Sequence, residues 1–239
     1  MAVAVAMSGG TAVAAADPVA TPAPTVTVDA IAEIPARSSI SVQTSVPGAR
    51  VGTVNEGESR PGLSIVKLYM VDFALRHGDG SESDKSLAER MIRFSDDGAA
   101  SALDAKYPDS IGAVAAEYGL PATRGGYWGF AMTSAADVTT FLRIKQTTDP
   151  GSPLFGWMAT AGDTAADGTP QNWGTANVRG VLGTKWGWGD DGLSGVASVS
   201  YGPGFVVAMF TFGTTADQDA DLSAAVPGLL LDKVAGTRR

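Results

Sequence analysis

The sequence predicts an α+β fold, in which an antiparallel sheet is flanked by helices and carries a small inserted all-helical lobe. Three observations lead to this prediction. Two short strand patterns, at residues 40–44 and 50–54, come first and are joined by a Pro-Gly turn. Helical patterns then fill much of residues 63–161, and three strand patterns separated by Gly-rich turns follow. The sheet therefore draws on both ends of the chain, with helices between them.

The helices are predicted from apolar periodicity and from residues that begin or end a helix. Residues 63–76 are apolar nearly all round, which is typical of a buried helix. Ser134 and Ser152-Pro153 each mark a helix start, and Gly119 marks a helix end. The shorter helices expected after the first one are 85–94, 98–106, about 110–118, 134–145 and a short one from 153.

The last third of the chain returns to strand patterns. Residues 162–177 are rich in Gly, Asp, Thr and Asn, which predicts a loop. Strands are expected within 178–188, 193–202 and 205–213. A final helix is expected from about Asp217, with a kink at Pro227.

The domain organisation is predicted as one domain, residues 38–239, preceded by two N-terminal segments. Within it, residues of about 38–76 and 178–239 form an α/β lobe, and about 77–177 form the helical lobe. Residues 1–16 are small and apolar and contain Ala-x-Ala steps, as at the end of a signal peptide. Residues 17–37 are rich in Pro and Thr, which predicts a linker with a short helix near 29–34. We therefore expect an exported protein, secreted or associated with the cell envelope.

Composition excludes several classes of function. The net charge of −8 and the pI near 4.6 argue against a nucleic-acid-binding protein, which needs clustered Lys and Arg. The chain has no Cys, so disulfides and thiolate chemistry are excluded. His77 is the one His, so a zinc site built from several His is excluded. No segment carries the roughly 20 apolar residues of a membrane span. The sequence predicts neither a metal nor a cofactor.

Ser64 and Lys67 form a Ser-x-x-Lys pair at the start of the predicted buried helix. Residues three apart on a helix lie on one face, with Cβ atoms about 5–6 Å apart. The amine can then take the hydroxyl proton, which is the minimum that an activated serine needs. The alternative interpretation is a Ser that caps the helix and a Lys whose stem packs on it.

These residues and two later motifs resemble the serine β-lactamase and penicillin-binding protein (D,D-peptidase) superfamily, above all the class A β-lactamases. The residues 64–67, S-I-V-K, match its first signature. The residues 95–97, S-D-D, stand in the place of the second signature, S-D-N. The residues 185–187, K-W-G, stand in the place of the third, K-T-G. Order, spacing and element type agree over residues 38–236.

The resemblance implies a role for each matched residue. Ser64 is the acylated nucleophile, Lys67 its base, and Ser95 the relay that passes a proton to the leaving nitrogen. Lys185 supplies positive charge that faces a substrate carboxylate and Ser95. The backbone N–H groups of Ser64 and of a residue near Trp188 form the oxyanion hole. Taken alone, Ser95 could be a helix cap and Lys185 a charge at a sheet edge.

The resemblance also implies that Asp97, Trp186, Gly187 and Trp188 bind the substrate. Three departures from the family pattern affect this binding and the release of the acyl group. Asp97 replaces an Asn, so an ionised carboxylate stands where an amide donates, and it could pair with Lys67. Trp186 replaces a small hydroxyl residue and could narrow the cleft. The segment 123–132 before the helix start at Ser134 has no acidic residue, and no Glu follows Glu117. The class A β-lactamases use a Glu there to activate the water that releases the acyl group.

The function expected from these features is that of an exported serine hydrolase or acyltransferase of the cell envelope. Ser64 is acylated by peptidoglycan-type peptides or β-lactams, with poor or no β-lactam turnover. Two alternatives stay open. One is a catalytically degenerate binding protein of the cell wall, which Asp97, Trp186 and the missing Glu favour. The other is a β-lactamase with a different deacylating group.

Overall fold

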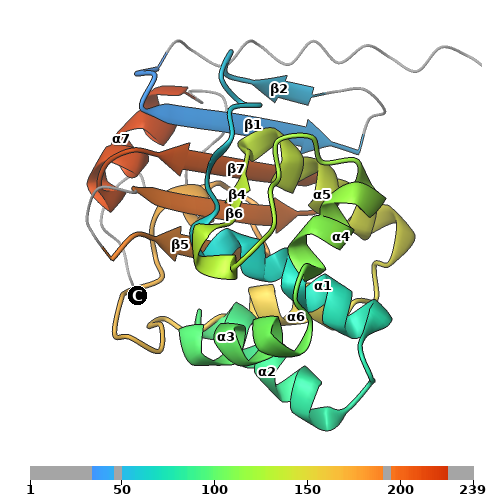
Figure 1. Cartoon of the computed structure of the whole chain (residues 1–239). Coiled ribbons are helices and arrows are strands. Elements are labelled where there is room, and N and C mark those ends of the chain that lie inside the picture. The colour runs from blue at the N-terminus through green and yellow to red at the C-terminus, as the bar shows by residue number, and fades with distance from the viewer. Residues whose placement is uncertain (1–33, 46–49, 191–194, 226–239) are drawn as a thin grey trace, which may run out of the picture.

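The computed structural model describes residues 34–45, 50–190 and 195–225. Its main feature is an antiparallel sheet of five strands in the order β2-β1-β7-β6-β5 (Figure 1). These strands are β1 (Ser38–Thr44), β2 (Arg50–Gly52), β5 (Gly183–Trp188), β6 (Val196–Gly202) and β7 (Phe205–Thr211). A second, two-stranded sheet pairs β3 (Arg60–Pro61) with β4 (Met132–Thr133). Strand β7 lies between β1 and β6. Both ends of the chain therefore contribute to one sheet, as the sequence predicts.

Helices fill the chain between β3 and β5 and follow β7. The 3₁₀ helices are η1 (Leu63–Val66), η2 (Trp128–Phe130) and η3 (Gly174–Asn177). The α-helices are α1 (Lys67–His77), α2 (Glu82–Arg93), α3 (Asp97–Lys106), α4 (Ser110–Tyr118), α5 (Ala135–Thr148), α6 (Pro153–Ala159) and α7 (Thr215–Ala225). The antiparallel sheet with helices confirms the predicted α+β fold class.

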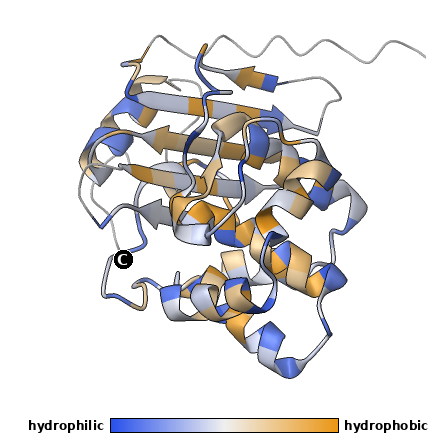
Figure 2. Cartoon of the chain, in the orientation of Figure 1, coloured by the Kyte–Doolittle hydropathy of each residue, from blue (hydrophilic) through white to orange (hydrophobic). Residues whose placement is uncertain are grey.

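The two faces of the sheet carry separate hydrophobic layers. Alternate residues of β7 point to opposite faces, as in any strand. Val206, Ala208 and Phe210 join the large core under α1, whereas Val207 and Met209 join a smaller cluster. Leu222 and Ala225 of α7 cover that smaller cluster from outside. Figure 2 shows the hydrophilic residues gathered on the outer turns of the helices and the hydrophobic ones between the layers.

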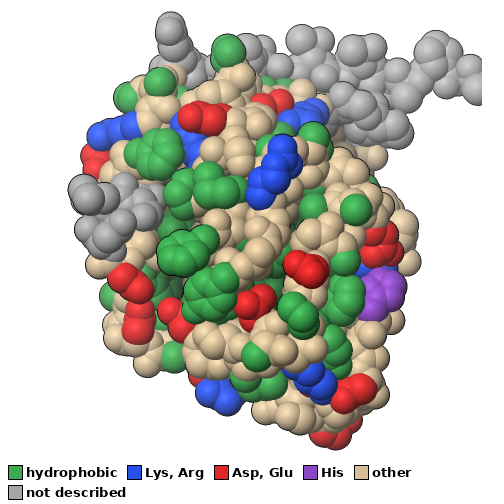
Figure 3. Space-filling model, in the orientation of Figure 1, with side chains coloured by type: hydrophobic (Ala, Val, Ile, Leu, Met, Phe, Trp, Pro, Cys, Tyr) green, Lys and Arg blue, Asp and Glu red, His purple; other side chains and the backbone are tan. Residues whose placement is uncertain are grey.

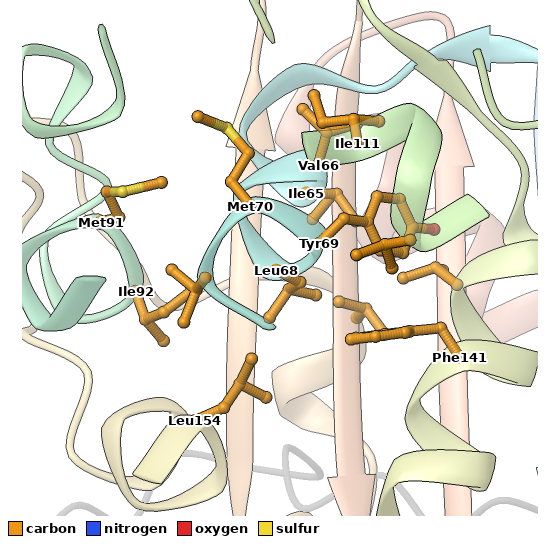
Figure 4. Packing of buried hydrophobic residues seen from close by; sticks show 14 of the residues in the cluster. Ile65, Val66, Leu68, Tyr69, Met70, Met91, Ile92, Ile111, Phe141 and Leu154 are labelled. Atoms are coloured by element: carbon orange, nitrogen blue, oxygen red, sulfur yellow. The ribbon is translucent and has the colours of Figure 1, made fainter. Parts of the chain in front are cut away.

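Helix α1 is the centre of the large core. Residues 65–71, which include Lys67, are at most 1% exposed. Figure 4 shows side chains of α2, α4, α5 and α6 packed round η1 and α1, among them Ile92, Phe141 and Leu154. Burying large apolar side chains in this way contributes roughly 1.5–3 kcal/mol for each of them. The structure therefore confirms that the helix predicted at residues 63–76 is buried.

The start of that helix is different from the prediction. Leu63–Val66 is a 3₁₀ turn, and the α-helix begins only at Lys67. The reason is the backbone of Leu63, whose φ of 50° lies in the left-handed region that non-Gly residues rarely adopt. The chain therefore turns sharply just before Ser64, while the N–H of Gly62 donates to the carbonyl of Ala131 over 2.8 Å.

Two other elements lie where the patterns did not place them. Helix α5 falls within the predicted helical lobe, 77–177, but it packs on β1 and β7. Its Thr139 and Thr140 contact the strand, since Ser41 Oγ lies 3.0 Å from Thr139 Oγ1 and Gln43 Nε2 donates to Thr140 Oγ1 over 2.9 Å. Strand β5 begins at Gly183 rather than near residue 178, because η3 and the turn after it occupy residues 174–182.

Part of the predicted N-terminal linker packs against the domain. Ile34 contacts the apolar cluster under α7, and Arg37 forms ion pairs with Asp217 and Asp221 of α7, at 2.7 and 2.9 Å. The predicted leader 1–16, most of the linker and of its short helix, and the kink at Pro227 lie outside the described residues. In the part of the chain that is described, no helix is both long and apolar enough to cross a membrane.

Candidate active site

Ser64 and Lys67 meet where η1 runs into α1. Lys67 Nζ donates to Ser64 Oγ over 2.8 Å. Ser64 is 8% exposed and lines a cleft, whereas Lys67 is completely buried. The Ser-x-x-Lys spacing therefore places a hydroxyl at the edge of solvent and an amine directly behind it.

Ser95 joins the two buried lysines of the site. It lies in the turn between α2 and α3, in the left-handed conformation at φ 53°. Its Oγ accepts a hydrogen bond from Lys185 Nζ over 2.8 Å, and its carbonyl accepts one from Lys67 Nζ over 2.7 Å. Three motifs far apart in the sequence thus come together at Ser95. The next residue, Asp96, caps α3 by accepting from the N–H of Ala99 over 2.9 Å, so its role is structural.

Asp97 supplies the third acceptor for Lys67. Its Oδ1 makes a short ion pair with Lys67 Nζ, and its side chain is 61% exposed to the cleft. Nζ therefore donates to Ser64 Oγ, to the carbonyl of Ser95 and to Asp97. Three acceptors round Nζ, one of them a carboxylate, favour the ammonium form of Lys67, which has no lone pair for a proton.

The charges of the two lysines are set by burial and by their neighbours. Burial lowers the pKa of Lys67, and the carboxylate of Asp97 opposes this by favouring the charged form. Burial also lowers the pKa of Lys185 well below its ordinary value, and the nearby charge of Lys67 lowers it further. The site therefore favours one protonated amine over two, and Asp97 places that charge on Lys67.

Strand β5 passes close to the nucleophile because Gly187 has no side chain. A Cβ on Gly187 would lie 2.8 Å from the backbone nitrogen of Ser64 and 2.9 Å from Cβ of Leu63. Only glycine allows the strand and η1 to approach so closely. The strand thereby brings Lys185 to Ser95 and Trp188 to the mouth of the cleft.

Trp186 lies on the other face of β5 from Lys185. Its indole is 6% exposed, packs with Trp173 and Val196, and donates to the carbonyl of Trp173 over 2.8 Å. It does not line the cleft, so the interpretation that it narrows the cleft is wrong. The reason is strand geometry, since neighbouring residues of a strand point to opposite faces.

Comparisons with solved structures identify this arrangement of elements. A β-lactamase from Streptosporangium roseum is 16% identical and matches with a TM-score of 0.63, over 80% of this chain and 91% of its own. Penicillin-binding protein D2 from Listeria monocytogenes in its ampicillin-bound form is 17% identical, with a TM-score of 0.60, over 79% and 95%. A D-alanyl-D-alanine carboxypeptidase from Mycobacterium tuberculosis is 17% identical, with a TM-score of 0.61, over 88% and 97%.

The chain has the serine β-lactamase and penicillin-binding protein fold. This confirms the fold that the three motifs predict. The likeness is one of structure, since no protein-family model matches the sequence and no curated protein matches it either.

In this β-lactamase-like fold, the cleft has a volume of about 630 Å³ and lies beside Ser64. Aromatic residues line it, and the patterns did not single out two of them, Tyr127 and Phe130. Phe130 is 84% exposed. Figure 3 shows hydrophobic side chains gathered across the middle of this face, with acidic side chains among them. The residues that line the cleft are Pro61, Leu63, Ser64, Asp97, Gly98, Ser101, Tyr127, Trp128, Gly129, Phe130, Ala131, Met132, Trp188, Gly189 and Asp190.

Trp128 connects this aromatic wall to the amine of Lys67. Lys67 Nζ lies 4.7 Å from the centroid of its ring, close enough for a cation–π contact. The indole N–H donates to Ser101 Oγ over 3.2 Å, which fixes the ring. The sequence offered one signal for it, the aromatic run Y-W-G-F at residues 127–130, shortly before the Ser134 helix start.

The segment that carries the water-activating Glu in the class A β-lactamases has no equivalent group here. The first acid after it is Asp137, which is 4% exposed. Its Oδ2 accepts from the N–H of Ala122 over 2.9 Å and from Thr123 Oγ1 over 2.7 Å. Asp137 therefore holds the segment in place and does not line the cleft. Across residues 34–45, 50–190 and 195–225, no cluster of three His, Asp or Glu could hold a metal ion.

Proposed function

We propose that this chain is a serine hydrolase or acyltransferase that forms an acyl-enzyme at Ser64 and releases it slowly. The observation that carries the proposal is the hydrogen bond of 2.8 Å between Lys67 Nζ and Ser64 Oγ, with the Lys185–Ser95 pair beside it. A nucleophile within hydrogen-bond reach of a base is the arrangement that covalent catalysis needs. The β-lactamase-like fold supports it.

Acylation begins with loss of a proton from Lys67. Asp97 is exposed to the cleft and links the ammonium group to solvent, so it can pass that proton outward. The freed lone pair of Nζ then accepts the proton of Ser64 while Oγ attacks the carbonyl carbon. The C–N bond of an amide or β-lactam breaks, and Ser95 gives its proton to the leaving nitrogen. Lys67, which has taken the proton of Ser64, then returns a proton to Ser95, whose carbonyl it contacts over 2.7 Å, while Lys185 holds the Ser95 hydroxyl in place over 2.8 Å.

Release of the acyl group needs a water molecule and a base to activate it. The segment 123–132 has no acid, and Asp137 is held by Ala122 and Thr123. Hydrolysis of the ester at Ser64 is therefore slow, and efficient turnover of β-lactams is not expected. Attack by an amine in place of water would complete an acyl transfer.

The partners follow from the resemblance and the fold. One structural neighbour is an ampicillin-bound penicillin-binding protein and another is a D-alanyl-D-alanine carboxypeptidase. We propose peptidoglycan-type peptides or β-lactams as acyl donors. The Ala-rich residues 1–16 support the proposal that the protein is exported and is either secreted or associated with the cell envelope.

One observation favours a second candidate, a binding protein of the cell wall without catalysis. Lys67 donates all its described hydrogen bonds and pairs with Asp97, which keeps it protonated. If Lys67 stays protonated during every encounter with a ligand, Ser64 remains a hydroxyl. Binding would then be the same in the Ser64→Ala variant.

Covalent labelling separates the two candidates. The protein is incubated with a fluorescent penicillin and, separately, with a fluorophosphonate. Wild type should be labelled, and Ser64→Ala should not. Ser223→Ala, which removes an exposed hydroxyl of α7, serves as the control and should label like wild type. Absence of labelling by both probes, or equal labelling of Ser64→Ala, would refute the acyl-enzyme.

A further inference from the structure

We propose that the cleft selects acyl donors whose leaving end is neutral or cationic and discriminates against those that carry a carboxylate there. This inference rests on the proposed function, because it concerns the substrate of the same serine. It narrows the acyl donors proposed above, so that penicillins and peptides with a free carboxylate on the leaving side should acylate Ser64 more slowly than donors without one. It follows from the charges that line the cleft, from the positions of the nearby cations and from the aromatic wall.

Among the described residues of the cleft, no cation is available to a substrate carboxylate. None of the described residues that line the cleft is Lys or Arg. Lys185 is 0% exposed, and its Nζ donates to Ser95 Oγ and to the carbonyl of Trp186, both over 2.8 Å. Lys67 is also 0% exposed and pairs with Asp97. Both amines are used inside the protein.

The hydroxyl residues of β5 do not fill that gap. Trp186 stands in the strand position next to Lys185, and its indole lies on the opposite face, against Trp173. Thr184, the hydroxyl residue before Lys185, also lies on that face, where its Oγ1 is 2.8 Å from Ser200 Oγ. The cleft-facing side of β5 therefore offers a carboxylate no charged donor and no hydroxyl from the strand.

Negative charge, in contrast, faces the cleft. Asp97 and Asp190 both line it, and both are exposed. Asp167 lies at its edge, where its Oδ2 accepts from the indole N–H of Trp188 over 3.1 Å. With Lys67 protonated, these three carboxylates still leave a net negative charge round the cleft. A substrate carboxylate would be repelled, and an ammonium group attracted.

The aromatic wall strengthens the same preference. Tyr127 and Phe130 are 53% and 84% exposed beside the cleft, with ring centroids 5.7 Å apart. Aromatic faces attract cations and bury apolar groups, and the Tyr127 hydroxyl is the one polar group that these two rings offer to a carboxylate. An acyl donor with an apolar acyl group and an uncharged or cationic leaving end fits both the aromatic wall and the acidic residues of the cleft.

Three matched acyl donors test the inference. They are phenylacetyl thioesters whose thiol leaving groups end in a primary amine, a carboxamide or a carboxylate. Ser64 Oγ attacks the thioester carbonyl, the C–S bond breaks, and the sulfur takes the proton from Ser95. Each acylation rate is measured as released thiol and divided by the rate of spontaneous hydrolysis of that thioester. This removes the difference in intrinsic reactivity.

The expected order is amine, then carboxamide, then carboxylate, with the amine donor at least about tenfold above the carboxylate donor. Asp190→Asn should reduce that ratio severalfold. Glu82→Gln is the matched control, because it also removes one negative charge, from a side chain that is 88% exposed on α2. It should leave the ratio unchanged. The ratio should also fall as ionic strength rises.

The outcomes separate the two proposals. If none of the three thioesters acylates Ser64, the proposed function fails, and the charge preference falls with it. If acylation occurs and the carboxylate donor reacts as fast as the amine donor or faster, the charge preference alone is overturned. An amine-to-carboxylate ratio that is the same in wild type, Asp190→Asn and Asp97→Asn would overturn it as well.

Discussion

The floor of the cleft and its rim differ in how their side chains are held. On the floor, Lys67 and Lys185 are completely buried, and each makes at least two hydrogen bonds to fixed partners. On the rim, Phe130 and Asp190 are exposed. Buried polar groups tolerate little change, because an unpaired one costs about 1–3 kcal/mol. We therefore expect substitutions on the floor to affect stability and the proposed acylation, and substitutions on the rim to affect mainly which substrate binds.

The largest effect is expected on the floor, from Lys67→Met. Acylation of Ser64 by the neutral thioester should fall by about 10²–10⁴-fold, since general-base catalysis is lost. The measurement is stopped-flow release of thiol under single-turnover conditions. Lys145→Met is the control, because Lys145 is also 0% exposed and pairs with the buried Asp72 at 2.6 Å, away from the cleft.

The control should lose stability but not reactivity. Breaking a buried ion pair by removing one partner costs about 3–5 kcal/mol, and urea unfolding measures this. The folded fraction of Lys145→Met should be acylated at the wild-type rate. Full acylation of Lys67→Met would contradict the role of Lys67 as base.

Gly187→Ala should give the next largest effect. A Cβ at this position would lie 2.8 Å from the backbone nitrogen of Ser64, so β5 or η1 must move. Loss of one oxyanion donor costs about 10²–10³-fold in rate, and we expect a decrease of about 10²-fold. The comparison variant is Gly112→Ala, where an added Cβ meets no atom within 4 Å. Equal acylation rates for Gly187→Ala and Gly112→Ala would show that β5 does not contribute to the oxyanion hole.

Asp97 connects the floor to the rim, because it pairs with the buried Lys67 and is itself exposed to the cleft. The variant Asp97→Asn tests how its charge affects Lys67. The Asp97 carboxylate raises the pKa of Lys67 against the effect of burial, so removing its charge lowers that pKa. Since acylation needs neutral Lys67, its rate rises as pH rises through that pKa. The rise should therefore shift to lower pH in Asp97→Asn, and the rate at pH 7 should increase severalfold. A lower rate at every pH would contradict this expectation and show that acylation needs the Asp97 carboxylate, either as the base or as the path of the Lys67 proton.

The smallest effect is expected on the rim, from Phe130→Ala. Its ring is 84% exposed, so the free energy of unfolding should change by no more than about 0.5 kcal/mol. An aromatic contact contributes about 0.5–1.5 kcal/mol, so the KM for a phenylacetyl donor should rise roughly two- to tenfold. Leu182→Ala is the control, because Leu182 is 57% exposed and does not line the cleft. An equal rise in KM for Phe130→Ala and Leu182→Ala would show that Phe130 does not contact the acyl donor.

The difference between floor and rim also explains what the sequence could predict. The floor residues Ser64, Lys67, Ser95 and Lys185 were found because three motifs resemble the signatures of the serine β-lactamase and penicillin-binding protein superfamily, and the structure brings all four together. The elements that carry them were found from their patterns. The strands at the two ends of the chain followed from their alternating patterns, whereas the order of the strands in the sheet was not predicted. Periodic elements leave such signals, because one face of each must be buried.

The rest depended on geometry without a local pattern. Phe130 and Asp190 come from a 3₁₀ turn and a loop end, where no period predicts which way a side chain points. The 3₁₀ turn before Lys67 depends on the φ of 50° at Leu63, which no propensity predicts. The direction of Trp186 was within reach, because the alternation that points Lys185 at Ser95 requires its neighbour to point away.

The central claim is that Ser64 becomes acylated readily and is released slowly. Intact-protein mass spectrometry tests it most directly, as a time course after a short exposure to the phenylacetyl carboxamide thioester and removal of the free donor. Wild type should carry one phenylacetyl group that persists over hours, and Ser64→Ala should carry none. Wild type without any adduct and without thiol release, or an adduct of the same size on Ser64→Ala, would contradict the claim.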